Sequence, residues 1–136
     1  MSQENVEFAK RMNRTLESEG YEAILPAIAP GFEFTTPADM AAEPDTYHGR
    51  DGIRRWFETF YEAMDEVRIV PERYLDAGDW VVVPSKLVTR GRTSGLVAEQ
   101  PVVLAWGIRD QKVVSLRLFA TEEEAFESIE ADPATG

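Results

Sequence analysis

The second half of the chain restricts the fold most, because it contains four strand-like segments joined by short connections. These segments cover Val67–Leu75, Trp80–Arg90, Pro101–Arg109 and Lys112–Ala120, and β-branched or aromatic residues recur in each of them. Connections of a few residues join antiparallel neighbours, whereas parallel neighbours need a long crossover. The sequence therefore predicts a largely antiparallel sheet in this half.

The first half supplies helices and one further strand. Apolar residues recur at helical spacing over Ser2–Glu19, over residues 21–28, where Pro26 limits the helix to about two turns, and over residues 49–65. The last of these is the most strongly amphipathic and should bury its apolar face. Phe32–Thr36 alternates aromatic and polar residues as a half-buried strand does.

A short helix is expected to close the chain. Thr121 and Glu124 have the spacing of a capping box, and apolar residues follow them. The predicted order is α-α-β-α-β-β-β-β-α, within one α+β domain over residues 1–131. Residues 132–136 are expected to form a frayed tail.

Charge and composition exclude several functions. The chain has 14 basic and 25 acidic residues, a net charge of −11, which disfavours binding to nucleic acid or to an anionic membrane. There is no cysteine, so disulfides and thiolate chemistry are excluded, in agreement with a cytoplasmic protein. The first residues have no basic region followed by an apolar run, so no signal peptide is expected.

Two segments resemble a known family. Tyr47–Phe57 (YHGRDGIRRWF) is similar to the aromatic-x-Gly entry to the third helix of NTF2-like proteins, and Lys112–Phe119 (KVVSLRLF) is similar to their closing strand. Thr121–Phe126 resembles the small bacterial SnoaL-like (polyketide cyclase-like) members. The resemblance implies a cone-shaped, cystatin-like roll in which three N-terminal helices pack on a curved antiparallel sheet. It also implies a hydrophobic cavity, a homodimer through the convex sheet face and no obligatory cofactor.

The resemblance does not fix one activity, because the fold supports several chemistries. Steroid isomerisation needs a carboxylate base and two acid groups, and the aligned positions hold Thr36, Met12 and Leu104. That mechanism is therefore rejected. The Asp-Arg-Asp set of the family's epoxide hydrolases cannot be placed either. A cyclase-type carboxylate could be Asp39, in the Pro37–Tyr47 loop, which is long enough to form a lid; a turn role would explain Asp39 equally well.

His48 is the candidate for proton transfer, because an imidazole titrates near neutral pH. Asp39 or Tyr47 would assist it. The alternative is that His48 lines the rim or binds backbone at the start of a helix. A single histidine without a carboxylate cluster gives too few ligands for a metal, so no metal site is expected.

Two cations on one strand are the candidate anion-stabilising groups. Lys86 and Arg90 share a face with Val82 and Val88. If that face is concave, Arg90 would stabilise the oxyanion of an enolate. The alternative is a bulge near Pro84 that turns both cations to solvent or to a dimer interface.

The proposed cavity is apolar and aromatic, which suits a compact hydrophobic, carbonyl-containing ligand. The candidate ligand-binding residues are Phe34, Thr36, Tyr47, Trp56, Phe60, Lys86, Val88, Leu104, Trp106, Leu116 and Leu118. The same side chains could instead fill the cone completely. Two functions therefore stay open: a cavity protein, with or without acid/base catalysis of the cyclase or isomerase type, and a non-catalytic dimeric binding or scaffold module.

Overall fold

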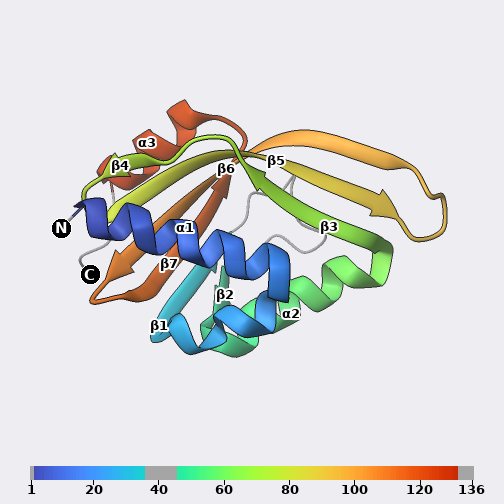
Figure 1. Ribbon diagram of the computed structural model, residues 1–136, viewed down its shortest axis with the longest axis horizontal. Coiled ribbons are helices and arrows are strands. Elements are labelled where there is room, and N and C mark those ends of the chain that lie inside the picture. Colours follow the sequence, from blue (N-terminus) through green and yellow to red (C-terminus); the bar gives the residue numbers. More distant parts are fainter. Residues whose placement is uncertain (1, 36–45, 132–136) are drawn as a thin grey trace.

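The computed structural model describes residues 2–35 and 46–131 of the chain (Figure 1). The helical elements are α1 (Ser2–Glu19), the 3-10 helix η1 (Tyr21–Ala27), α2 (Gly49–Ala63) and α3 (Glu122–Ala131). The strands are β1 (Ile28–Thr35), β2 (Thr46–His48), β3 (Met64–Pro71), β4 (Leu75–Ala77), β5 (Trp80–Gly91), β6 (Val97–Arg109) and β7 (Lys112–Phe119). The expected tail, residues 132–136, lies outside the described residues.

The strands form one sheet in the order β2-β1-β7-β6-β5-β3, and β4 pairs with β5. The four strands predicted in the second half pair antiparallel, as expected. The curved antiparallel sheet that the resemblance implies needs one correction, because β1 runs parallel to β7. No short turn joins β1 to β7, so hairpin geometry does not set their relative direction. Asp110 and Gln111 both have positive φ angles, as a two-residue hairpin turn between β6 and β7 requires.

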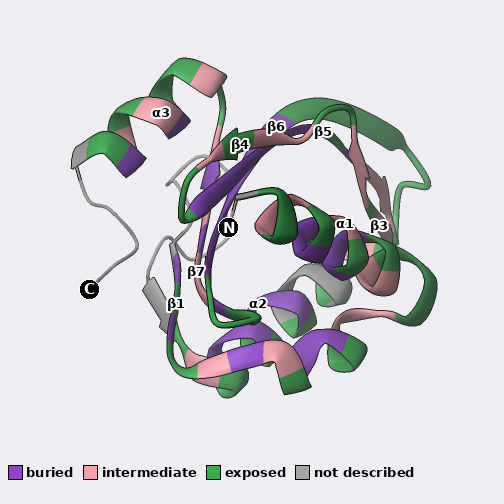
Figure 2. Ribbon diagram, turned by 60° about the vertical axis from the view of Figure 1, so that its left-hand side comes forward, coloured by how far each residue is buried: buried purple, intermediate pink, exposed green. Residues whose placement is uncertain are grey.

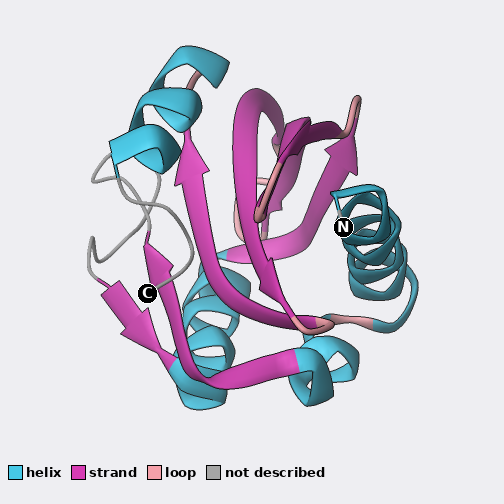
Figure 3. Cartoon of the chain, turned by 90° about the vertical axis from the view of Figure 1, so that its left-hand side faces the viewer, coloured by secondary structure: helices cyan, strands magenta, loops and turns pink. Residues whose placement is uncertain are grey.

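The sheet is curved and has helices on both faces. α1, η1 and α2 lie inside the curve, whereas α3 lies outside it (Figures 2 and 3). We call these the inner and outer faces. On β5, Val81, Val83 and Leu87 belong to the inner core with the first three helical elements, whereas Trp80 and Val82 pack with α3 in a separate outer cluster.

Several element boundaries differ from the sequence-based expectations. The second helix is a 3-10 helix of seven residues that contains Pro26, and its short length agrees with the limit expected from a residue without a backbone N–H. β1 begins at Ile28 rather than Phe32, and its pairing with β7 shifts register between Ile28 and Glu33. The predicted strand 67–75 is divided into β3 and β4. Within the described residues, no helix is long and apolar enough to span a membrane.

Candidate functional site

The aromatic and aliphatic residues expected to line a cavity do share the inner core. Their side chains come from β1, α2, β6 and β7 and are almost fully buried, namely Phe34, Trp56, Leu104, Trp106, Leu116 and Leu118. These residues pack against one another and against α1, so this part of the cone is a solid core.

A chain of ring contacts leads through this core to its edge. Phe34 and Trp56 have ring centroids 4.8 Å apart, and Trp56 contacts Phe57 edge-on at 4.9 Å. Phe57 in turn stacks on Tyr21, with centroids 4.9 Å apart and planes 4° from parallel. Phe57 thus has core contacts on one side and borders the cavity described next.

A cavity of about 120 Å³ opens where the C-terminal end of α1 meets α2 and β3. Its apolar wall is formed by Leu16, Phe57, Val67 and Ile69, with Gly20 at one side. An engineered apolar cavity of about 150 Å³ binds benzene, so this space suits a ligand of roughly that size. The cavity lies at the edge of the cone, and its lining shares no residue with the ligand-binding set predicted from the sequence.

An ion pair lies at the rim of this cavity and joins α1 to β3. The carboxylate of Glu17 accepts hydrogen bonds from Nε and Nη2 of Arg68, the first at 3.2 Å. The bond and charge of Glu17 raise the pKa of Arg68 above its ordinary value, so Arg68 stays cationic. Both side chains are partly exposed, which places the charges at the mouth and leaves the wall apolar.

A buried amide lies one helical turn before the cavity residues of α1. Asn13 is only 4% exposed, and its Nδ2 donates to Tyr74 Oη at 3.1 Å. Lys10 lies over the ring of the same tyrosine, with Nζ 5.6 Å from the centroid. Ser85 is the other buried polar residue among those described, and its hydroxyl donates to the carbonyl of Val83.

Lys86, Val88 and Arg90 lie on the outer face. They alternate with the inner residues Val83 and Leu87, and β5 pairs with β6 without a register shift from Trp80 to Arg90. Lys86 Nζ lies 3.9 Å from Glu99, and Arg90 donates to Asp65 at 2.9 Å. The prediction that these residues line a concave pocket is therefore wrong. The bulge near Pro84 that the alternative explanation required is also absent from the pairing of β5 with β6.

His48 lies at the opposite edge of the sheet from Arg90. It ends β2, its side chain is 70% exposed, and its Nδ1 is 3.8 Å from Glu33. Three strands, β1, β7 and β6, separate β2 from β5, so the structure does not bring His48 and Arg90 together. A shallow hollow beside His48 is lined by Pro30 and by the first turn of α2.

The remaining candidates cannot be placed in full. Thr36 and Asp39 lie outside the described residues, and so does most of the Pro37–Tyr47 loop. Tyr47 pairs with Phe34 through its backbone, but its side chain and that of Phe60 are outside the description. Among the residues described, no group of three or more His, Asp or Glu side chains could hold a metal ion.

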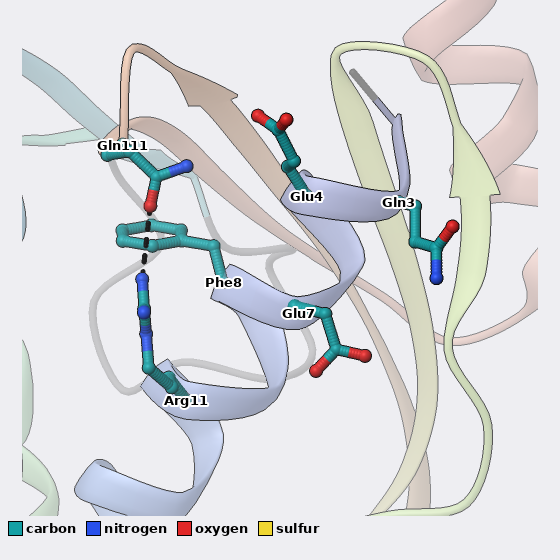
Figure 4. A pocket seen from close by; sticks show the side chains of 6 residues that line it. All are labelled: Gln3, Glu4, Glu7, Phe8, Arg11 and Gln111. Atoms are coloured by element: carbon teal, nitrogen blue, oxygen red, sulfur yellow. Dashed lines mark hydrogen bonds between the residues drawn. The ribbon is translucent and has the colours of Figure 1, made fainter.

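A wider hollow, of about 570 Å³, lies on the surface beside the first turns of α1 (Figure 4). The side chains of Arg11 and Gln111 are joined by a hydrogen bond of 3.0 Å, and the Arg11 guanidinium lies over the Phe8 ring, with Cζ 5.4 Å from the ring centroid. Phe8 itself is buried. The hydrogen-bonded side chains of Arg11 and Gln111 therefore cover Phe8, the one apolar residue that lines this hollow. The hollow is for this reason a poorer ligand site than the cavity bordered by Phe57.

Sequence reasoning missed the cavity residues Leu16, Phe57, Val67 and Ile69, the rim pair, and the burial of Asn13. One signal was present for Asn13, because it occupies an apolar position of the repeat formed by Val6, Ala9 and Leu16. A polar residue at such a position is either exposed by a local irregularity or buried and hydrogen-bonded. The rim pair joins residues 51 positions apart, a contact that no local pattern predicts.

Comparison with known proteins agrees with this architecture. Similar solved structures include an NTF2-like protein of unknown function from Burkholderia pseudomallei (19% identity, 90% of this chain and 95% of that one, TM-score 0.76). A second is TerC co-crystallised with polyporic acid (23% identity, 93% of this chain and 98% of that one, TM-score 0.76). A third is a putative SnoaL-like polyketide cyclase from Jannaschia sp. CCS1 (20% identity, 97% of this chain and 95% of that one, TM-score 0.72). No curated protein sequence matches significantly. The family model of the SnoaL-like domain matches residues 9–116, and the chain therefore belongs to the SnoaL-like family within the NTF2-like fold.

Proposed function

We propose that this protein binds a small apolar molecule in the cavity between α1, α2 and β3. The observation that carries the proposal is the cavity itself, about 120 Å³ with an apolar wall that includes Leu16, Phe57 and Val67. Small-molecule sites are typically concave and apolar with a few polar groups, and here those groups are Glu17 and Arg68 at the rim. The structurally similar TerC, which was co-crystallised with polyporic acid, supports a cyclic, carbonyl-containing ligand class.

Binding is favoured over catalysis by where the titratable groups lie. In the described part of the chain, the charged side chains near the cavity are Glu17 and Arg68, which already bond each other. His48 lies on β2, at the other edge of the sheet from β3. Arg90 lies on β5, next to β3, but it is on the outer face and bonds Asp65. An acid/base reaction would need groups such as Asp39 to reach the ligand. Reversible binding in the cavity does not require any such group to reach the ligand.

Binding of toluene and acetophenone by isothermal titration calorimetry tests the proposal. For ligands of seven to nine heavy atoms we expect Kd on the order of 0.1–1 mM, equivalent to about −4 to −5.5 kcal/mol. Leu16→Trp should fill the cavity and abolish binding. Val88→Trp, on the outer face, is the matched control and should leave binding unchanged.

Folding of both variants is checked by circular dichroism. Shifts of the Leu16, Val67 and Ile69 methyl signals on titration of the wild-type protein give a readout that needs no substitution. Binding that survives in a folded Leu16→Trp protein, or methyl signals that stay fixed while heat is released, would refute this location.

We also propose that a second copy of the chain is the macromolecular partner, through the outer face. α3 covers the part of that face around Trp80, Val82 and Ala105. The β5–β6 hairpin projects beyond α3 (Figure 1), and its end exposes Leu96 and Val97 by 73% and 64%. Adjacent exposed large apolar residues on a strand end favour an interface.

A further inference from the structure

The two charged residues at the rim of the cavity keep hydrogen-bonding groups that the protein does not use. Glu17 and Arg68 both line the cavity, and Nε and Nη2 of Arg68 donate to the same carboxylate oxygen, Oε1 of Glu17. A guanidinium has five N–H donors, and a carboxylate has two acceptor oxygens. Among the described residues, three N–H groups of Arg68 and Oε2 of Glu17 therefore have no partner. A ligand in the cavity lies next to both a donor and an acceptor.

The short distance between the two side chains requires a ligand whose own donor and acceptor are close together. Arg68 Nε lies 3.2 Å from Glu17 Oε1, so the two groups meet at the mouth. A carboxamide has an N–H donor and a carbonyl acceptor on the same carbon. Its N–H can donate to the carboxylate while its carbonyl accepts from the guanidinium. An alcohol would have to serve both groups from a single oxygen atom.

The charges around the rim disfavour an ionised head group. Glu66 is a second carboxylate near Arg68, two residues before it on β3. The hydrogen bond and charge of Glu17, and to a smaller extent the charge of Glu66, raise the pKa of Arg68 above its ordinary value. An anion would therefore approach a cation that carboxylates already balance, and an ammonium group would lie against a guanidinium of the same sign. A neutral head group avoids both costs.

The position of the pair fits a polar head group attached to an apolar ring. The wall of the cavity is apolar, whereas the side chains of Glu17 and Arg68 are 36% and 49% exposed. A ring against the wall leaves water, while an amide at the mouth keeps part of its hydration and costs less to bury than it would in the core. An exposed ion pair contributes little to stability, so its removal should be visible in ligand binding rather than in folding.

We propose that Glu17 and Arg68 form the recognition pair of the cavity, and that its ligand is a neutral cyclic molecule with a carboxamide group. The amide N–H donates to Glu17 Oε2, the amide carbonyl accepts from Arg68, and the ring packs against Phe57 and Val67. This inference rests on the proposed binding function and names the ligand class of that site. The two rim residues then determine specificity for the head group.

Four compounds of equal heavy-atom count test the proposal by calorimetry at pH 7. Cumene has no polar group, acetophenone has only the acceptor, benzamide has both the donor and the acceptor, and benzoate is an anion. Because their hydration differs, the informative quantity is how a substitution changes the Kd of each compound, in which the hydration of the free compound cancels. Binding of none of the four by wild-type protein would remove both the proposed binding function and this inference.

Substitution of each rim residue should affect the compounds that use it. Arg68→Met should weaken binding of benzamide and acetophenone about fivefold each and leave cumene within about twofold. Glu17→Gln should weaken benzamide about fivefold and leave acetophenone and cumene within about twofold. Benzoate should bind more tightly to Glu17→Gln, because the charge of Arg68 is then less compensated. Glu19→Gln is the matched control: it makes the same change of charge at an exposed residue of α1 outside the cavity lining, and it should leave all four affinities unchanged.

Three results would overturn the proposal and leave the binding function standing. One is equal weakening of all four compounds by Arg68→Met, which would mean that this side chain only shapes the mouth. Another is an equal effect of Glu17→Gln and Glu19→Gln, which would indicate a response to net charge alone. The third is binding of cumene by wild-type protein without binding of benzamide. Circular dichroism shows that each variant is folded before titration.

A measurement on wild-type protein tests the orientation of the ligand without any substitution. In the complex with benzamide, the amide protons of the ligand should give intermolecular nuclear Overhauser effects to the γ-protons of Glu17. The ring protons should give them to the methyl groups of Val67. Effects from the ring protons to Glu17, with the amide protons near Val67, would contradict the proposed contacts.

Discussion

Leu104→Ala measures whether the inner face beneath the helices is solid. Leu104 is 1% exposed and lies between Val83 of β5 and Leu118 of β7 on the inner face. Truncating a buried leucine costs about 2.7–5 kcal/mol, rising with the volume of the hole left behind. Because the flanking side chains stand on hydrogen-bonded strands that cannot close the gap, we expect a loss of about 3–4 kcal/mol, or roughly 10 °C in Tm for a chain of this length.

Guanidinium unfolding followed by tryptophan fluorescence gives the free energy, since Trp56, Trp80 and Trp106 are all buried in the native state. Glu58→Ala is the control: the residue is exposed on α2, and the change should stay within about 0.5 kcal/mol of wild type. A loss below about 1 kcal/mol for Leu104→Ala would mean that this side chain already borders empty space. The solid core described above would then be incorrect.

Two further outcomes are expected. Thr121 accepts a hydrogen bond from the Glu124 amide and donates to the Glu124 carboxylate. Thr121→Ala should therefore lower the free energy of chemical unfolding by about 1 kcal/mol, whereas Thr121→Ser should retain most of the wild-type stability. Equal stability of the two variants would refute the cap. If the outer-face hairpin is a dimer interface, Leu96→Asp with Val97→Asp should give monomers in sedimentation velocity, whereas Val114→Asp, beneath α3, should unfold the protein. A wild-type monomer at 100 µM, or a dimer unaffected by the two changes, would rule that interface out.

Elements that depend on local patterns were predictable from the sequence. The apolar repeat of α2 and the strands from β5 to β7 appear within a few residues of the expected bounds. Thr121 also caps α3 as expected, because its hydroxyl accepts a hydrogen bond from the Glu124 amide. In each case the residues that determine the element are neighbours in the chain, so periodicity and turn chemistry contain the necessary information.

The face occupied by Lys86 and Arg90 could not be derived in the same way. Alternation correctly groups both with Val82, but it does not say which of the two faces is inner. All residues from Trp80 to Ser85 are buried, because α1 and its neighbours cover one face of β5 and α3 covers the other. A strand covered on both sides loses the polar alternation that marks its solvent face. Only the docking position of α3, which lies more than 30 residues further along the chain, resolves the ambiguity.

The contrast between His48 and Asn13 shows why chemistry read from residue type alone gives an incomplete site. His48 has the more versatile side chain, yet the fold leaves it exposed on an edge strand, where water competes for every bond it could make to a ligand. Asn13 cannot transfer a proton at neutral pH, but it is buried, and its Oδ1 has no hydrogen-bond partner among the described groups. In a low-dielectric interior a single hydrogen bond discriminates strongly, because the wrong ligand leaves the group without any partner. A polar residue within an apolar helical repeat is the sequence signal that identifies such a buried position.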